Sequence, residues 1–173
     1  MPEPRLALIA ALAVALGWLV VGLAGLVRPQ STFVVSRLMF PLGALGGVLL
    51  AIAGLASLAA PPVELVLPLG LPDLPMHLRL DSLSAFFLFL LGSAVAGISV
   101  FAAGYFRSGE GTSPGLLCLQ YHVFLASMTL VLLANDAYAF MVSWESMALS
   151  SYFLVTTQHR IPEIRAAGFL YLL

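Results

Sequence analysis

The feature that most constrains this chain is a series of five long apolar stretches. They cover residues 6–27, 38–60, 83–105, 116–134 and 137–155. At 1.5 Å rise per residue, a helix of this length matches the roughly 30 Å hydrocarbon core of a bilayer. The sequence therefore predicts an all-α fold, a polytopic membrane helical bundle that forms a single transmembrane domain over residues 1–173.

The composition supports a membrane class and excludes others. The chain is 61% hydrophobic and 9% charged, whereas soluble domains carry about 25% charged residues. It has seven Arg, no Lys and a net charge of −1, so we expect the lipid bilayer as a partner and no nucleic acid. The single cysteine, Cys118, excludes an internal disulfide and a Cys-rich metal site. We expect it to be a small buried residue, and we expect no metal and no cofactor in this chain.

The two ends of the chain lead to different expectations. The first stretch is too long for the core of a signal peptide, which spans about 7–15 residues, so we predict a retained helix. The last apolar run, residues 166–173, is too short to cross a membrane. We therefore expect five complete transmembrane helices plus a truncated sixth, in an N-terminal fragment of a larger subunit.

The segment from residue 61 to residue 80 breaks the helical pattern. It contains five prolines, a density that excludes a helix. Glu64–Leu67 and Met76–Leu80 are typical of short extended segments joined by a turn. We expect a small extramembrane β-hairpin on the membrane surface between the second and third helices. His77 in this hairpin has no second ligand at metal spacing, which favours a solvated surface histidine.

The arginines predict an orientation. The connections on one side of the membrane hold five of them, and the other side holds two. By the positive-inside rule the five-Arg side is cytoplasmic, so the N-terminus and the hairpin are expected to be periplasmic. The five are Arg28, Arg37, Arg107, Arg160 and Arg165, and the two are Arg5 and Arg79.

Small and capping residues predict how the helices pack and begin. Gly43 and Gly47 recur at a four-residue spacing that lets two helices approach closely. Asp81 precedes the third span and Asp136 the fifth, and both are suited to cap a helix N-terminus. A role in ion transport remains an alternative for Asp136.

Glu145 is the charged residue that draws the functional question. It stands near the middle of the fifth span, where a carboxylate costs about 2.5–3.5 kcal/mol on insertion scales. Ser143, Ser146 and Ser150 share one face of that helix, and Glu145 is about 100° from Ser146. Ser146 and Ser150 are candidates for helix packing. Two interpretations remain open: a carboxylate that binds and releases a proton, and a buried acid fixed by hydrogen bonds between helices.

His122 is the second ionisable residue inside a predicted span. Histidine titrates near neutral pH and can relay protons. Its place toward one end of the fourth span also suits a structural, hydrogen-bonded histidine. His122 and Asp136 are therefore weaker candidates than Glu145 for proton translocation. No Lys or Arg lies in the core of a predicted span, so a positive partner for Glu145 must come from elsewhere.

Several segments carry a resemblance to a known family. Residues 125–128, 130–136 and 144–155 read LASM, LVLLAND and WESMALSSYFLV, and residues 80–87 read LDSLSAFF. These resemble the antiporter-like proton-translocating membrane subunits of respiratory complex I, Mrp-type cation/proton antiporters and membrane-bound hydrogenases. The WESM segment and AGFLYLL at residues 167–173 look most like the formate hydrogenlyase and hydrogenase-4 (component B) branch.

The resemblance implies a function and a location. It implies that Glu145 corresponds to the family's fifth-helix glutamate, a proposed proton-translocation residue whose lysine partner lies on a later helix. It also implies a bacterial inner membrane, together with partner membrane subunits and redox subunits of a hydrogenase- or NADH dehydrogenase-type complex. The chain by itself is not expected to be a catalyst. The alternatives are a monovalent cation/proton antiporter subunit without redox partners and a structural membrane scaffold.

Overall fold

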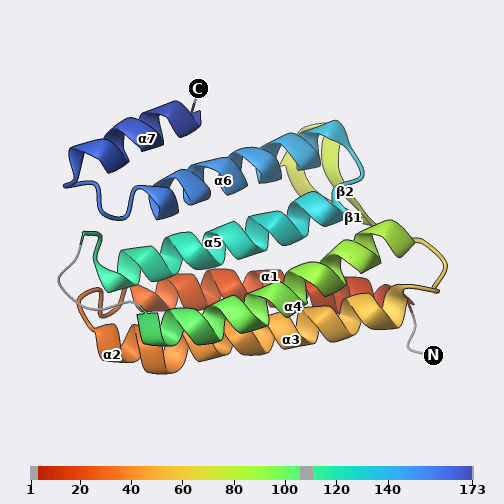
Figure 1. Cartoon of the computed structure of the whole chain (residues 1–173). Helices are drawn as coiled ribbons and strands as arrows, with labels where there is room; N and C mark the ends of the chain where they lie inside the picture. Colours follow the sequence, from red (N-terminus) through yellow and green to blue (C-terminus); the bar gives the residue numbers. More distant parts are fainter. Residues whose placement is uncertain (1–3, 106–110, 173) are drawn as a thin grey trace.

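The computed structural model describes residues 4–105 and 111–172, and it shows a helical bundle that carries one small sheet (Figure 1). Arg107 and Leu173, which enter the sequence predictions, lie outside the described residues. The elements are α1 (Pro4–Gly25), α2 (Thr32–Val34), the π-helical turn η1 (Val35–Met39), α3 (Phe40–Ser57), β1 (Val63–Leu71), β2 (Leu74–Leu80), α4 (Ser82–Tyr105), α5 (Pro114–Leu133), α6 (Ala137–Val155) and α7 (Pro162–Leu172).

The second helical segment begins earlier than the sequence predicts. α2, η1 and α3 form one continuous helix over Thr32–Ser57 rather than over residues 38–60. Ser31 caps its start by accepting a hydrogen bond from the Val34 N–H at 3.3 Å. Pro41 therefore lies inside the helix and not in its first turn. It has no N–H to donate four residues back, and the wide turn η1 stands directly before it.

α3 and α4 approach each other through glycine. A Cβ atom built on Gly54 would lie 2.5 Å from the backbone nitrogen of Phe89, and one built on Gly47 would lie 2.8 Å from the carbonyl oxygen of Gly92. No side chain fits at either place without moving a backbone. The glycines of α3 thus bring the backbones of the two helices together.

α5 lies between α1 on one side and α6 on the other (Figure 1). Gly25 of α1 lets α5 approach, since a Cβ there would lie 3.1 Å from the Cys118 sulfur. Cys118 is a free, fully buried cysteine, as the sequence predicts. The Gly115 N–H at the start of α5 donates to the Pro29 carbonyl at 2.9 Å, which fixes the start of α5 beside the end of α1.

The predicted hairpin is present and is longer than predicted. β1 and β2 pair antiparallel, with Glu64 opposite Arg79. Asp73 adopts a φ of 66° in the turn between them, a left-handed conformation that Asp tolerates in turns. The Asn135 N–H donates to the His77 carbonyl at 2.9 Å. The hairpin is therefore attached to the connection between α5 and α6.

α6 and α7 form an outer layer on the far side of α5 (Figure 1). α7 begins at Pro162, before the predicted residue 166, and its Tyr171 hydroxyl lies 2.6 Å from the hydroxyl of Ser151 on α6. Gly168 faces the side chains of Thr156 and Tyr152. α7 is thus placed against the second half of α6.

Among the described residues, four helices are long and apolar enough to cross a membrane: α1, the continuous Thr32–Ser57 helix, α4 and α5. Of the five complete spans that the sequence predicts, these four are therefore supported, and the fifth, α6, is not. α6 has 19 residues, but they include Glu145 and several serines, which reduce its apolar character.

Candidate functional site

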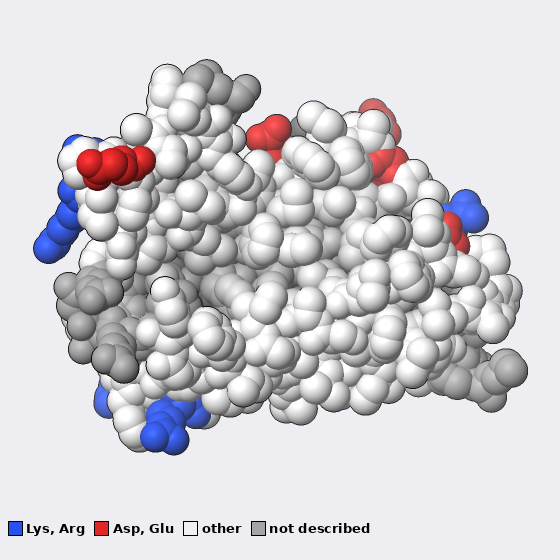
Figure 2. All heavy atoms as spheres, in the orientation of Figure 1, with Lys and Arg blue, Asp and Glu red and all other residues white. Residues whose placement is uncertain are grey.

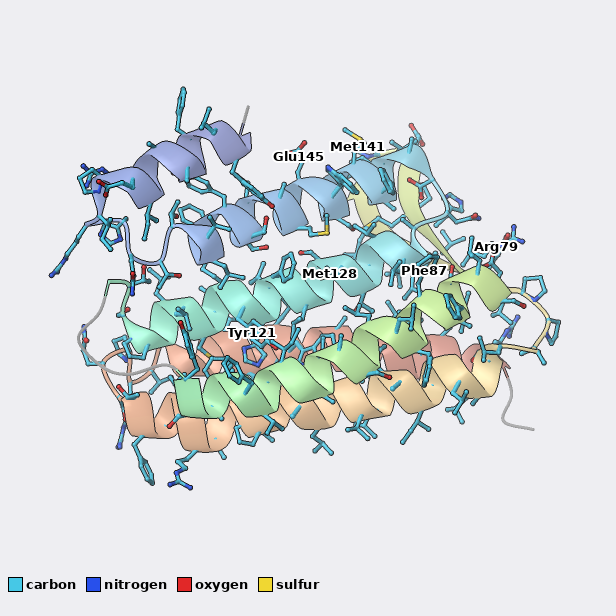
Figure 3. The ribbon with its side chains drawn as sticks, viewed as in Figure 1. Arg79, Phe87, Tyr121, Met128, Met141 and Glu145 are labelled. Atoms are coloured by element: carbon cyan, nitrogen blue, oxygen red, sulfur yellow. The ribbon has the colours of Figure 1, made fainter. Side chains whose placement is uncertain are left out.

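Glu145 lies on the side of α6 that faces away from the bundle. Ala139, Ser143 and Ser150 are the buried residues of α6, and α6 packs on α5. Glu145 is two residues beyond Ser143, about 200° around the helix, and it is exposed. Figure 3 shows its side chain pointing away from α5. Within the described residues, the Glu145 carboxylate forms no hydrogen bond or ion pair.

The serines of α6 use their hydroxyl protons inside their own helix. The Ser146 hydroxyl donates to the Val142 carbonyl at 2.8 Å, and the Ser150 hydroxyl donates to the Ser146 carbonyl at 2.7 Å. The sequence spacing suggested that Glu145 and the serines of α6 share one broad polar sector, but in the structure they face different directions. The serine side of that sector turns toward α5, and the carboxylate turns outward.

His122 has the opposite environment. It lies on α5 and is fully buried. Its Nδ1 atom is 2.8 Å from the Cys118 carbonyl oxygen, one turn earlier in the same helix. The ring stacks on Phe40 with centroids 6.3 Å apart and meets Tyr121 edge-on at 5.3 Å. Nε2 is buried and has no hydrogen-bond partner within the described residues.

The polar groups around His122 come from several helices. A Cβ atom on Gly43 would lie 2.9 Å from His122 Nε2 and 3.3 Å from the Ser99 hydroxyl oxygen. The Ser99 and Tyr121 hydroxyls are 2.8 Å apart and hydrogen-bonded, and the Trp18 indole N–H donates to the Gly43 carbonyl at 3.2 Å. Figure 3 shows Tyr121 between α5 and α4. α1, α3, α4 and α5 thus enclose one small polar centre.

Asp136 acts as a cap and as a tie between the hairpin and α6. One of its carboxylate oxygens accepts from the Ala139 N–H at 2.7 Å, which confirms the predicted cap, and the other accepts from the His77 N–H at 2.6 Å. The hydrogen bond from Ala139 is the main reason that the Asp136 pKa lies below its ordinary value, with smaller contributions from His77. His77 is half-exposed, and its Nδ1 lies 3.4 Å from the Asp136 carboxylate.

Asp81 also caps a helix as predicted. Its carboxylate accepts from the Ser84 N–H at 2.9 Å. This hydrogen bond is the largest cause of a lowered Asp81 pKa. Arg79 stands between two acids, 3.8 Å from Glu64 and 3.6 Å from Asp81. These pairs place the charged residues of the hairpin where α4 begins.

The structure brings together only some of the predicted site residues. Gly43, a packing candidate in the sequence, lies directly beside His122. Glu145 and Asp136 stand apart from them, and no hydrogen bond within the described residues joins either acid to His122. The described residues also contain no group of three His, Cys, Asp or Glu side chains that could hold a metal ion.

Sequence reasoning missed the Ser99–Tyr121 pair and the contact between Gly43 and His122. Ser99 is one of several serines in apolar surroundings, and the sequence gives no sign of which helix each one faces. A signal for Gly43 existed in its small size near the middle of an apolar segment, but that signal indicated only close helix packing.

Comparison with known proteins finds partial relatives. The chain is 37% identical over 112 residues to hydrogenase-4 component B of Escherichia coli K12, a match that covers 65% of this chain and 15% of that protein. It is 35% identical over 102 residues to an uncharacterized protein found in two strains of Mycobacterium tuberculosis, covering 58% of this chain and 16% of that protein. No family model matches the chain.

These matches place the chain beside part of a much longer protein. It spans about one sixth of the length of the curated relatives. The apolar helices of the described residues indicate a membrane protein, and the match adds a similarity to a hydrogenase component.

Proposed function

We propose that this chain is part of a membrane subunit of a hydrogenase- or NADH dehydrogenase-type complex, and that Glu145 binds and releases a proton there. The redox chemistry takes place in partner subunits, and the movement of protons is coupled to it. The similarity to hydrogenase-4 component B and the four helices apolar enough to span a membrane support the setting. The complex is assigned to a bacterial inner membrane.

The observation that carries the proposal is the unpartnered, exposed carboxylate on α6. A charged group in contact with lipid is costly, and such groups normally face other protein or a hydrated cavity. Within the described residues, nothing pairs with Glu145. In the proposal, a group outside the described residues therefore lies beside the Glu145 carboxylate. The proposal also makes α6 the fifth membrane helix of the subunit.

A change in those surroundings would move the proton. A positive charge close to Glu145 favours the ionised carboxylate, and withdrawal of that charge favours the protonated acid. Redox turnover that shifts such a charge would thus load and unload Glu145. His122 takes a secondary role, because its ring is enclosed and Nδ1 is held by the Cys118 carbonyl. Asp136 is assigned a structural role, because both of its oxygens accept backbone hydrogen bonds.

The proposal includes an orientation with the N-terminus and the hairpin in the periplasm. Arg28, in the connection after α1, and Arg37, in η1, lie near one end of the bundle, and the hairpin lies at the other. A cysteine at position 73 in the hairpin should react with an impermeant thiol reagent in intact cells, and one at position 30 should not. Reaction at position 30 alone would reverse the orientation.

The test of function is proton uptake into vesicles that contain the full complex, comparing wild type with Glu145→Gln at matched assembly. We expect uptake to fall by about tenfold or more while redox turnover persists, because glutamine cannot take up a proton. Glu163→Gln on α7, which removes an exposed carboxylate elsewhere, is the matched control and should leave uptake unchanged.

Three other results would point away from the proposal. Unchanged uptake in Glu145→Gln would make Glu145 a structural acid and favour the scaffold alternative. Equal loss in both variants would indicate a general effect of charge. Proton movement that depends on a sodium gradient and not on redox turnover would instead identify a cation/proton antiporter subunit.

A further inference from the structure

A long apolar groove runs between α1 and α3 on the outside of the bundle. It has a volume of about 540 Å³ and is lined by 15 residues, all of them Ala, Gly, Val, Leu, Ile or Trp. This volume falls within the range of about 300–1,000 Å³ that is usual for small-molecule sites. In a protein that spans a membrane, a groove of this composition faces hydrocarbon.

The groove exists because small residues of α1 face large residues that project from α3. On α1, Ala10, Ala13 and Gly17 line it, and a Cβ on Gly17 would meet nothing within 4 Å. On α3, Leu45 and Leu49 stand out at about half exposure.

Trp18 forms the floor of the groove. It is buried, and a Cβ on the facing Gly46 would lie 2.5 Å from the indole nitrogen. The indole also donates to the Gly43 carbonyl of α3. Trp18 therefore fixes the spacing of the two helices, and the groove does not close by a small shift of α1.

The charge at one end of the groove identifies the occupant. Arg28, after the end of α1, and Arg37, in η1, are both exposed. In the chain, Arg28 follows the groove residue Val21 by seven residues, and Arg37 precedes the groove residue Leu42 by five residues. Neither guanidinium forms an ion pair or hydrogen bond within the described residues. Figure 2 shows basic atoms without acidic neighbours on the corner of the molecule that α2 occupies in Figure 1.

The opposite end of the groove has mixed charge. Arg5 lies there, next to the groove residue Leu6, and shares a separate polar hollow with Glu64 and Arg79. An anion would meet the carboxylate of Glu64 at this end. The Arg28 and Arg37 end is thus the one that suits a negatively charged head group.

We propose that the groove binds an anionic phospholipid, with an acyl chain between α1 and α3 and the phosphate beside Arg28 and Arg37. From Val21 to Leu6 the groove extends about 22 Å along α1, which is longer than the roughly 15 Å half-thickness of the hydrocarbon core. An acyl chain that enters from the Arg end can thus lie in it over its full depth. The indole N–H of Trp18 is already used by the Gly43 carbonyl, and the other lining side chains are apolar and could not orient a partner protein by hydrogen bonds. Basic sites between membrane helices, by contrast, suit anionic head groups.

The test uses photoactivatable lipids in vesicles that contain the full-length protein with the subunits it retains. The probes are phosphatidylglycerol and phosphatidylcholine with the same diazirine-bearing acyl chain, and mass spectrometry maps the labelled peptides. We expect α1 and α3 to be labelled about thirtyfold more by the anionic probe, since each of the two arginines near the head group favours it by about 1 kcal/mol. The outward residues Val100 and Phe101 of α4 report contact with bulk lipid.

Two matched pairs of variants separate the groove from the charges. Gly17→Leu fills the groove and should lower labelling of α1 and α3 severalfold, while Gly97→Leu adds the same bulk at another open position and should not. Arg37→Gln should remove most of the preference for the anionic probe, and Arg160→Gln should preserve it.

Three outcomes would overturn the proposal. Labelling of α1 and α3 no stronger than that of α4 would mean bulk lipid only. Labelling of α4 with none in the groove would mean that a protein segment covers it. Anionic preference that survives Arg37→Gln together with Arg28→Gln would remove the assigned head-group site. None of these results depends on whether Glu145 carries protons.

Discussion

His122 on α5 and Glu145 on α6 have opposite environments. His122 is enclosed by four helices, its Nδ1 is held by a backbone carbonyl, and aromatic rings pack on its faces. Glu145 is exposed on the outermost side of α6 and pairs with no described residue. The chain itself provides the surroundings of the histidine, whereas the surroundings of the glutamate must come from outside the described residues.

The difference follows from how the helices approach each other. Glycines bring α3 against α4 and α1 against α5, so side chains at those contacts are buried on several sides. α6 packs on α5 through one face only, where Ala139, Ser143 and Ser150 are buried. A polar group in the bundle is thus surrounded by other helices, while Glu145 on the outer face of α6 pairs with no described residue.

The largest effect on stability should come from inserting a side chain between the closely packed helices α3 and α4. Gly54→Leu would place side-chain atoms against the Phe89 backbone, and we expect it to destabilise the fold by about 3 kcal/mol or more, because the helices must separate. Thermal unfolding of the protein in lipid nanodiscs would measure this. Gly97→Leu, where a Cβ meets nothing within 4 Å, should leave the unfolding temperature almost unchanged. Equal effects would mean that the helices are not closely packed.

The comparison of His122 with Glu145 can be tested directly by stability. His122→Ala leaves a cavity beside Phe40 and Tyr121, and we expect a loss of about 2–3 kcal/mol. Glu145→Gln removes no contact within the described residues and should change stability by less than about 0.5 kcal/mol. The same unfolding assay applies to both variants. A Glu145→Gln variant as unstable as His122→Ala would show that the glutamate is a structural acid.

Asp136 should contribute an intermediate, pH-dependent amount to the free energy of unfolding. Asp136→Ala removes the cap of α6 and the tie to His77, and at pH 7 we expect a cost of about 1–2 kcal/mol. Because the pKa of Asp136 is lower in the folded protein than in the unfolded chain, its ionised form favours folding. This contribution is complete above the unfolded pKa of about 3.9 and is lost as the pH falls through the folded value.

The measurement for Asp136 is the stability difference between wild type and Asp136→Ala across that pH range. It should be constant from pH 7 to pH 5 and shrink below pH 4. A difference that instead shrank between pH 7 and pH 6 would contradict the assignment of this pH dependence to the Asp136 carboxylate.

A loss of stability at the lower end of the range for Asp136→Ala should come from breaking the Ser99–Tyr121 hydrogen bond. Tyr121→Phe keeps the ring that packs on Phe40 and His122 but removes the hydroxyl, so we expect a loss of about 1 kcal/mol. Ser99→Ala should cost a similar amount, and the double variant should cost less than the sum. Simple additivity would mean that the two hydroxyls are not coupled.

Much of the fold could be predicted from the sequence. Apolar runs predict the helices because each must satisfy its backbone within the membrane, and proline density predicts the hairpin. The caps at Asp81 and Asp136 follow from residue type next to an apolar run. The sequence could not predict which side of α1 or α3 is buried. In a helix that contacts lipid, the outward and inward sides are equally apolar, so the apolar pattern does not distinguish them.

The rest depends on contacts that a sequence does not display. The early start of the second helix depends on the η1 turn before Pro41. The direction in which the Glu145 side chain points depends on which face of α6 packs on α5. Ser143 and Glu145 are both polar, so polarity alone did not predict which of them faces α5. The polar centre around His122 forms only because residues from four helices meet. The groove beside Trp18 forms only because Gly46 of α3 lies opposite the indole ring.

The central claim, that Glu145 takes up and releases a proton during turnover, is tested most directly by redox-triggered infrared difference spectroscopy on the whole complex. The account predicts a carboxylic acid carbonyl band that changes with the redox state, is lost in Glu145→Gln and is retained in Glu163→Gln. A band that persists in Glu145→Gln, or no carboxylic acid change in the wild type, would contradict it.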